Sequence, residues 1–217
     1  MSLKKLLLFL LLIPHMMFCY YQRPFTIMIN PAGDAKHTGR KIEDTFERGI
    51  TLQYTEQLKK IIEATYSHIS VILTRFPGDM VMPLQHANFA NRLNVDLYLS
   101  IHFYHETGIK PNMYIYRFSY NDDFMVPSQP LAFYSYDQAH LGSSKKTATW
   151  AEQIKQIITQ PLYAKKFNVH GVYKLPFAPL IGIKAPAIGI EASLKNKDDW
   201  TVYIDPIVKC VGEILKT

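Results

Sequence analysis

The sequence predicts a single α/β domain with a mostly parallel sheet and helices on both of its faces. Short apolar runs alternate with longer amphipathic segments along the chain. Its 217 residues are enough for one well-packed domain and few for two. Strand–helix alternation at this density is typical of sheets covered by helices on both faces.

The expected strands are short, apolar or alternating, and rich in β-branched and aromatic residues. The first, FTIMI, ends at an Asn-Pro pair, and the second, VILTR, ends just before a Pro-Gly pair. The third, VDLYLSIHFY, is the most strongly patterned. The strands are predicted at 25–29, 71–75, 95–104, 113–120 and 187–192.

The expected helices show apolar residues at helical spacing. In the segment 44–66, Phe46, Ile50, Tyr54 and Leu58 recur every four residues, which predicts an amphipathic helix. Further helices are predicted at 83–94, 148–159 and 202–216. Residues 121–147 fit neither period, and we expect a long loop with a functional role.

The N-terminal residues 1–22 resemble a targeting segment. Lysines precede an apolar run that Pro14 interrupts, and the run is short for a membrane span. We expect either a signal peptide or an uncleaved anchor that attaches the protein to a membrane. Residues 23–217 would then form the mature domain, exported to the periplasm or cell envelope.

Composition and charge limit the classes of partner that this protein is expected to bind. The net charge of +6 suits an anionic surface or polymer, but the lysines are scattered and no nucleic-acid motif is present. We therefore expect no nucleic-acid partner. The two cysteines, Cys19 and Cys210, lie in the targeting segment and the last helix, so a disulfide framework is not expected.

Four polar side chains are predicted to meet at one edge of the sheet. His37 lies in the loop NPAGDAKHTGR after the first strand, and His102 and Glu191 lie near the ends of two others. Glu47 lies in the first turn of the helix that follows the His37 loop. Ligands of open α/β sheets bind beyond the carboxyl ends of the strands, where these residues are expected.

This set of side chains suits hydrolysis by a zinc-bound water. Two imidazoles and one carboxylate leave a fourth tetrahedral position for water, whose pKa the metal lowers to roughly 7. A second carboxylate, not bound to the metal, can take the proton from that water and deliver it to a leaving amine.

Several stretches resemble the zinc-dependent N-acetylmuramoyl-L-alanine amidases of the amidase-3 type, which cut between glycan and stem peptide in peptidoglycan. They are IMINPAGDAKHTGR, FERGITLQYTEQLKK, VILTRFPGDMVMPLQHANFAN, VDLYLSIHFY and APAIGIEASLKN. Together they span about residues 25–200 in the family's order. The resemblance implies hydrolysis of the amide between N-acetylmuramic acid and L-alanine.

Carried over by position, the resemblance implies that Glu47 and His102 bind Zn²⁺ and that Glu191 is the catalytic carboxylate. The opening loop departs from the family, because Gly33 stands where the first zinc histidine is expected. Either His37 supplies this ligand from a loop of different path, or the site has lost one ligand. We favour His37, since a glycine-bearing loop can redirect a side chain.

Structural roles compete with these assignments. His37 alone would be a solvated loop residue, and Glu47 has the spacing of a capping box with Asp44. Glu191 could pair with Lys184 or Arg92, whereas an unpaired imidazole at His102 would be costly in so apolar a strand. His105 and Glu106 are expected at the rim, where either could act as a substitute ligand if His37 does not bind the metal.

Two other functions remain as alternatives. One is a non-catalytic peptidoglycan-binding or regulatory domain of the same fold with a degenerate metal site. The other is a membrane-tethered structural or adhesion domain that uses its aromatic segment 111–150. Metal content separates the first alternative from the enzyme, and replacement of Glu47, His102 and Glu191 separates the second.

Overall fold

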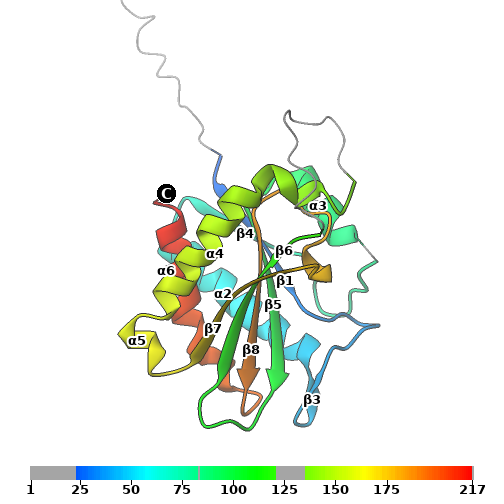
Figure 1. The fold of residues 1–217 in the computed structure, drawn as a ribbon. Helices are drawn as coiled ribbons and strands as arrows, with labels where there is room; N and C mark the ends of the chain where they lie inside the picture. Colours follow the sequence, from blue (N-terminus) through cyan, green and yellow to red (C-terminus); the bar gives the residue numbers. More distant parts are fainter. Residues whose placement is uncertain (1–22, 83, 121–134, 217) are drawn as a thin grey trace, which may run out of the picture.

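A six-stranded mixed sheet forms the centre of the molecule, which confirms the predicted α/β class (Figure 1). The computed structural model describes residues 23–82, 84–120 and 135–216. The strand order is β4-β1-β5-β8-β6-β7. The strands are β1 (Phe25–Pro31), β4 (Ile69–Leu73), β5 (Leu97–His105), β6 (Asn112–Phe118), β7 (Asn168–Leu175) and β8 (Ala187–Leu194).

Most neighbouring strands run parallel. β4, β1, β5 and β8 share one direction, while β6 is antiparallel to β8 and parallel to β7. The reversal follows from the short connection 106–111 between β5 and β6, because a parallel return needs a crossover of a dozen or more residues. The carboxyl ends of β1, β5 and β8 therefore meet at one edge of the sheet.

Helices lie on both faces, as predicted. They are α2 (Glu47–Thr65), α3 (Gln85–Leu93), α4 (Ser144–Ile158), the short α5 (Pro161–Ala164) and α6 (Ile204–Ile214). α6 packs against both α2 and α4, these three helices cover one face of the sheet, and α3 packs on the opposite face (Figure 1).

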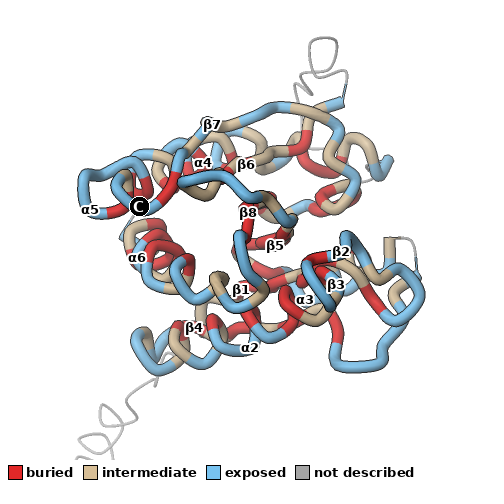
Figure 2. The backbone as a smooth tube through the Cα atoms, turned by 90° about the horizontal axis from the view of Figure 1, so that it is seen from below, coloured by how far each residue is buried: buried red, intermediate tan, exposed pale blue. Residues whose placement is uncertain are grey.

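Strand alternation divides the core between the two faces. Ile27 and Ile29 of β1 belong to the cluster under α2, α4 and α6, whereas Met28 packs with Ala87 and Tyr98 on the α3 side. Buried residues accordingly follow the strands and the inner sides of the helices (Figure 2).

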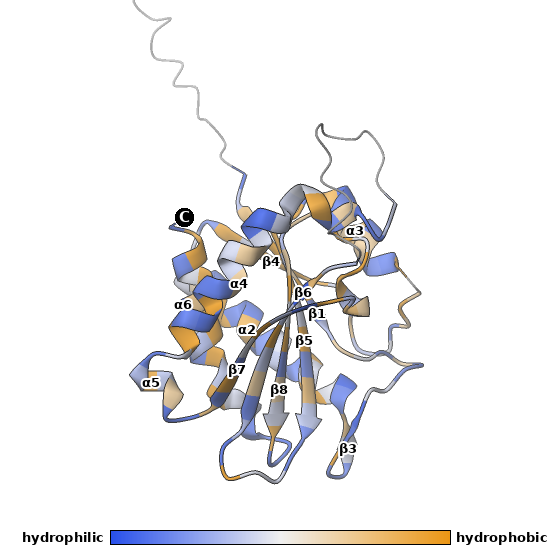
Figure 3. Ribbon diagram, in the orientation of Figure 1, coloured by the Kyte–Doolittle hydropathy of each residue, from blue (hydrophilic) through white to orange (hydrophobic). Residues whose placement is uncertain are grey.

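The face under α3 leads to the predicted site. Tyr98 lies near the start of β5, and by alternation Ser100, His102 and Tyr104 continue along the same face to the carboxyl end. A small hairpin, β2 (Lys41–Ile42) and β3 (Thr45–Phe46), lies beside the carboxyl end of β5 (Figure 1). Its hydrophilic residues contrast with the apolar strands (Figure 3).

Some elements differ from the sequence prediction. β7 was not predicted, because this edge strand contains Gly171 and no fully buried residue, so its apolar alternation is weak. α4 begins at Ser144, inside the predicted loop 121–147, and a 3₁₀ helix (Ala139–Ser143) precedes it.

Two predictions fall on residues that the structure does not describe. The targeting segment 1–22 and the part 121–134 of the predicted loop lie outside the described residues. In the part of the chain that is described, no helix combines the length and apolar character that crossing a membrane requires.

Burial of Leu58 in the core under α2 should contribute strongly to the free energy of unfolding. Leu58 is fully buried, and Leu58→Ala should lower the free energy of unfolding by about 2–5 kcal/mol through lost burial and a residual cavity. Urea denaturation followed by circular dichroism measures this loss. The control Leu162→Ala, at a side chain 65% exposed, should change it by less than about 0.5 kcal/mol. Equal losses would contradict the assignment of the core.

Candidate active site at the carboxyl ends of the strands

His102 and Glu191 are brought together by the sheet itself. β5 and β8 are parallel neighbours, and their register places His102 directly opposite Glu191. Residues opposite each other on adjacent strands project to the same face, which is the face shared with Ser100 and Tyr104. Figure 2 looks onto the sheet from the end where these strands finish.

Glu47 reaches this pair from the start of α2. Its side chain is 4% exposed, and Oε1 accepts a hydrogen bond of 3.0 Å from the Phe103 amide in β5. The same oxygen lies 3.6 Å from Nδ1 of His102. The capping-box alternative is wrong, because the N-cap is Phe46 and no side chain caps the helix.

Arg40 joins the two carboxylates. Its Nη2 donates to Glu47 Oε1 at 3.0 Å, its Nε donates to Glu47 Oε2 at 3.1 Å, and its Nη1 donates to Glu191 Oε1 at 2.6 Å. Tyr116 completes the environment of Glu191 by donating its hydroxyl to Oε2 at 2.7 Å. The cation paired with Glu191 is thus Arg40, and neither Lys184 nor Arg92.

These contacts determine the ionisation of Glu47. Burial alone would raise the pKa of Glu47, but hydrogen bonds from His102 and Arg40 outweigh it and lower the pKa to about 2. The carboxylate is therefore charged at any physiological pH. The same contacts raise the pKa of Arg40, although its partial burial acts in the opposite direction.

The imidazole of His102 is oriented by a chain of polar side chains. Nε2 lies 2.8 Å from Ser100 Oγ, which accepts a hydrogen bond of 3.2 Å from Asn30 Nδ2. Thr74 in turn donates to Asn30 Oδ1 at 2.7 Å. With Nε2 held in this way, Nδ1 is the nitrogen that faces Glu47, and the ring edge contacts Phe177.

His37 points elsewhere in this structure. Its side chain is 69% exposed, and Nδ1 lies 3.3 Å from Asp34 Oδ2. Gly33 has φ +75°, and a Cβ there would lie 2.8 Å from Cβ of Arg48, so this backbone path leaves no room for a side chain. His37 and His102 nevertheless line one cavity of about 580 Å³.

The donor set can be compared with what zinc requires. Glu47 and His102 are adjacent and of the chemical types that zinc takes. In residues 23–82, 84–120 and 135–216, no three His, Cys, Asp or Glu side chains are grouped closely enough to hold one ion. Two donors fit, and a third would have to come from movement of the loop that carries His37.

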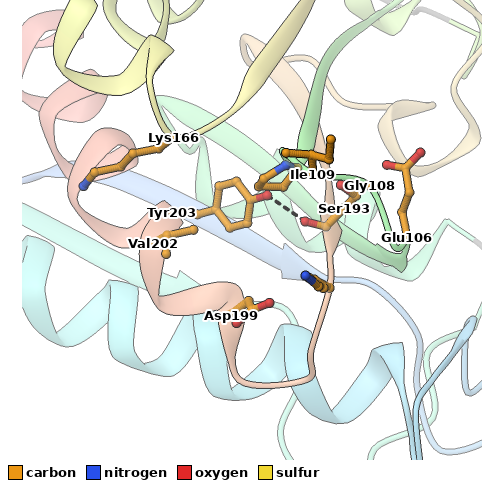
Figure 4. Close-up of a pocket in the computed structure, with 10 residues that line it drawn as sticks. Glu106, Gly108, Ile109, Lys166, Ser193, Asp199, Val202 and Tyr203 are labelled. Carbon is orange, nitrogen blue, oxygen red and sulfur yellow. Dashed lines mark hydrogen bonds between the residues drawn. The ribbon is translucent and has the colours of Figure 1, made fainter.

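A second cavity lies near the same edge but has different residues (Figure 4). Its volume is about 320 Å³, and its lining includes Glu106, Lys166, Ser193 and Tyr203. The Tyr203 hydroxyl donates to the Ser193 carbonyl at 2.7 Å. Glu106 accepts a hydrogen bond of 2.7 Å from Asn112. Glu106 therefore has its own partners and lines a cavity that contains neither Glu47 nor His102.

The sequence analysis missed the residues that organise the carboxylates. Arg40 and Ser100 were not singled out, and Tyr116 was not linked to Glu191. The one available signal was position: Ser100 and His102 share a face of one strand, and Arg40 directly follows Gly39 in the loop. Nothing in the spacing indicates that Arg40 reaches across to Glu191.

The sheet and its rim define an α/β domain of the kind that binds ligands beyond the carboxyl ends of its strands. Residues 27–210 match the N-acetylmuramoyl-L-alanine amidase family, and the chain belongs to this family. A curated relative, N-acetylmuramoyl-L-alanine amidase CwlM of Bacillus licheniformis, is 32% identical over 90 residues, or 42% of this chain. The match spans 36% of that relative's length.

Solved structures show the same fold. The N-acetylmuramoyl-L-alanine amidase of Clostridium difficile 630 superposes with a TM-score of 0.65 at 18% identity, covering 90% of this chain and 99% of that one. The catalytic domain of CwlV from Bacillus (Paenibacillus) polymyxa gives 0.64 at 15% identity, with 88% and 98% covered. AmiC2 of Nostoc punctiforme gives 0.64 at 16% identity, with 89% and 98% covered.

Gly39 should be needed for the approach of the loop to Glu47. It has φ +73°, and an added Cβ would lie 2.8 Å from both Cβ and Oε2 of Glu47. Gly39→Ala should therefore lose more unfolding free energy than Gly78→Ala, in which φ is +86° and the added Cβ meets nothing within 4 Å. The control isolates backbone strain, about 1–2 kcal/mol. Urea denaturation tests this, and equal losses would contradict the close approach.

Asp34 should make the His37 loop sensitive to acid. Burial would raise its pKa, but hydrogen bonds chiefly from the His37 and Val81 amides lower it from 3.8 to about 2. Because the folded state favours the ionised form, this stabilisation is complete above about pH 4 and is lost as the pH falls through 2. Unfolding free energies measured from pH 5 to 2 should fall less steeply for Asp34→Asn than for wild type. Glu152→Gln, at an exposed carboxylate, should keep the wild-type slope.

Proposed function

We propose that this protein hydrolyses the amide bond between N-acetylmuramic acid and L-alanine in peptidoglycan. Membership of the amidase family supports the reaction class. The observation that carries the proposal is the juxtaposition of His102, Glu47 and Glu191 at the carboxyl ends of β5 and β8. Since peptidoglycan lies outside the cytoplasmic membrane, we propose that the protein is exported to the periplasm or cell envelope.

The proposed cofactor is Zn²⁺, held by Glu47 and His102 with His37 as third ligand. Support comes from the donor chemistry: the charged carboxylate of Glu47 lies 3.6 Å from a nitrogen of His102. Bound zinc would supply a water of lowered pKa and polarise the amide carbonyl. Ser100 would keep the imidazole oriented, since a hydrogen bond to the distal nitrogen fixes the ring of a metal-binding histidine.

The proposed role of Glu191 is proton transfer. Its carboxylate would accept a proton from the attacking water as oxygen bonds to the amide carbon. It would return that proton to the alanine nitrogen as the carbon–nitrogen bond breaks. Tyr116, which donates to Oε2, would orient the carboxylate and leave Oε1 for the reacting groups once Arg40 releases it.

Replacement of Glu191 tests this role. Glu191→Gln keeps the shape of the side chain but cannot carry the proton, so hydrolysis should fall about 10²–10⁴-fold. Cleavage of this amide releases the α-amino group of L-alanine, and amine labelling of digested peptidoglycan measures it. Glu106→Gln, a rim carboxylate in the second cavity, should retain activity. Full activity of Glu191→Gln would show that Glu191 does not transfer the proton.

Metal analysis of the purified protein is the second measurement. We expect about one zinc ion per chain in wild type and in Glu191→Gln. A protein that binds peptidoglycan without metal and without cleavage would favour the non-catalytic alternative.

A further inference from the structure

We propose that Arg40 is a built-in cation that competes with metal for the carboxylates of this site. Its guanidinium forms hydrogen bonds with the carboxylates of both Glu47 and Glu191. This guanidinium must leave Glu47 before a metal ion can bind there. The inference rests on the proposed function, in which Glu47 is a zinc ligand. The inference adds that Arg40, in the loop before α2, lowers the affinity of this site for a metal ion.

The first support is the number of carboxylate oxygens that Arg40 engages. Its guanidinium donates to both oxygens of Glu47 and to Oε1 of Glu191, at 3.0, 3.1 and 2.6 Å. Charge-assisted bonds of this bidentate kind are the stronger class of protein hydrogen bond. A metal ion approaching Glu47 would therefore have to replace bonds that already exist.

The second support is that the backbone fixes Arg40 in place. The Arg40 amide donates to Glu47 Oε2 at 3.1 Å, and the Glu47 amide donates to the Arg40 carbonyl at 2.8 Å. Gly39 permits this contact, because its φ is +73° and any Cβ would overlap Glu47. The guanidinium also lies over the Tyr104 ring, 5.4 Å from its centroid. Such constraints distinguish Arg40 from a freely moving surface arginine.

The third support is charge. Glu47 and Glu191 have side chains only 4% and 18% exposed, and carboxylates so placed need a nearby cation. Arg40 supplies one positive charge to this pair. While it remains, it repels a divalent ion. Once it is removed, the two carboxylates are left with a deficit of positive charge that zinc would meet.

The competition can be measured by zinc titration of the metal-free full chain against a chromophoric chelator. Arg40→Gln removes the charge and should tighten zinc binding at least tenfold. Arg40→Lys keeps the charge but cannot form the bidentate pair, so its affinity should be intermediate. Arg23→Gln is the matched control, because Arg23 forms an exposed pair with Asp96 and should leave zinc affinity unchanged.

Thermal unfolding gives a readout independent of activity. Without metal, Arg40→Gln should melt below wild type, because two carboxylates lose their cation. Added zinc should raise its melting temperature more than that of wild type. If Arg40→Gln does not fold without metal, Arg40→Lys carries the comparison.

The outcomes distinguish this inference from the proposed function. Equal zinc affinity in wild type, Arg40→Gln and Arg40→Lys would overturn the competition and leave the zinc amidase intact. Failure of all variants to bind zinc would overturn both the competition and the proposed metal. Tighter binding in Arg40→Gln, with Arg23→Gln unchanged, supports both.

Discussion

The carboxylate of Glu47 is the contact on which this edge of the molecule depends. It begins α2, accepts the Phe103 amide of β5, and receives the backbone and side chain of Arg40 from the preceding loop. Three separate segments are therefore joined through one ionised group. Its pKa of about 2 expresses how strongly these partners favour the charged form despite burial. Without this charge, the loop would lose its charge-assisted hydrogen bonds to Glu47.

Around this contact, the residues on the strands are fixed by the sheet, whereas the conformation of the loop depends on its own hydrogen bonds. His102 and Glu191 are fixed by the register of β5 and β8, and Ser100 orients the imidazole. Residues 32–40 of the loop belong to no strand and have no such constraint from a sheet ladder. Asp34 instead holds their conformation by accepting the amides of Lys36 and His37. The strands therefore hold their site residues by register, and the loop holds its own through side-chain to backbone hydrogen bonds.

The loop of residues 33–40 brings a guanidinium to the two carboxylates of the site. In one arrangement Arg40 bridges the carboxylates of Glu47 and Glu191, and in the competing arrangement that we propose a metal ion would take its place at Glu47. The structure shows the first arrangement, with His37 turned toward Asp34. The positive φ of Gly33, the direction of His37 and the position of Arg40 all belong to the path of residues 33–40.

The sequence by itself determined the class of fold, because apolar periodicity depends only on local spacing and burial. It also determined that His102 and Glu191 share an edge, since both lie near the carboxyl ends of buried strands. It could not place Arg40, whose partners are 7 and 151 residues away, nor the direction of the His37 side chain. Those depend on the loop's φ angles and on which groups meet across the fold, which only the tertiary structure decides.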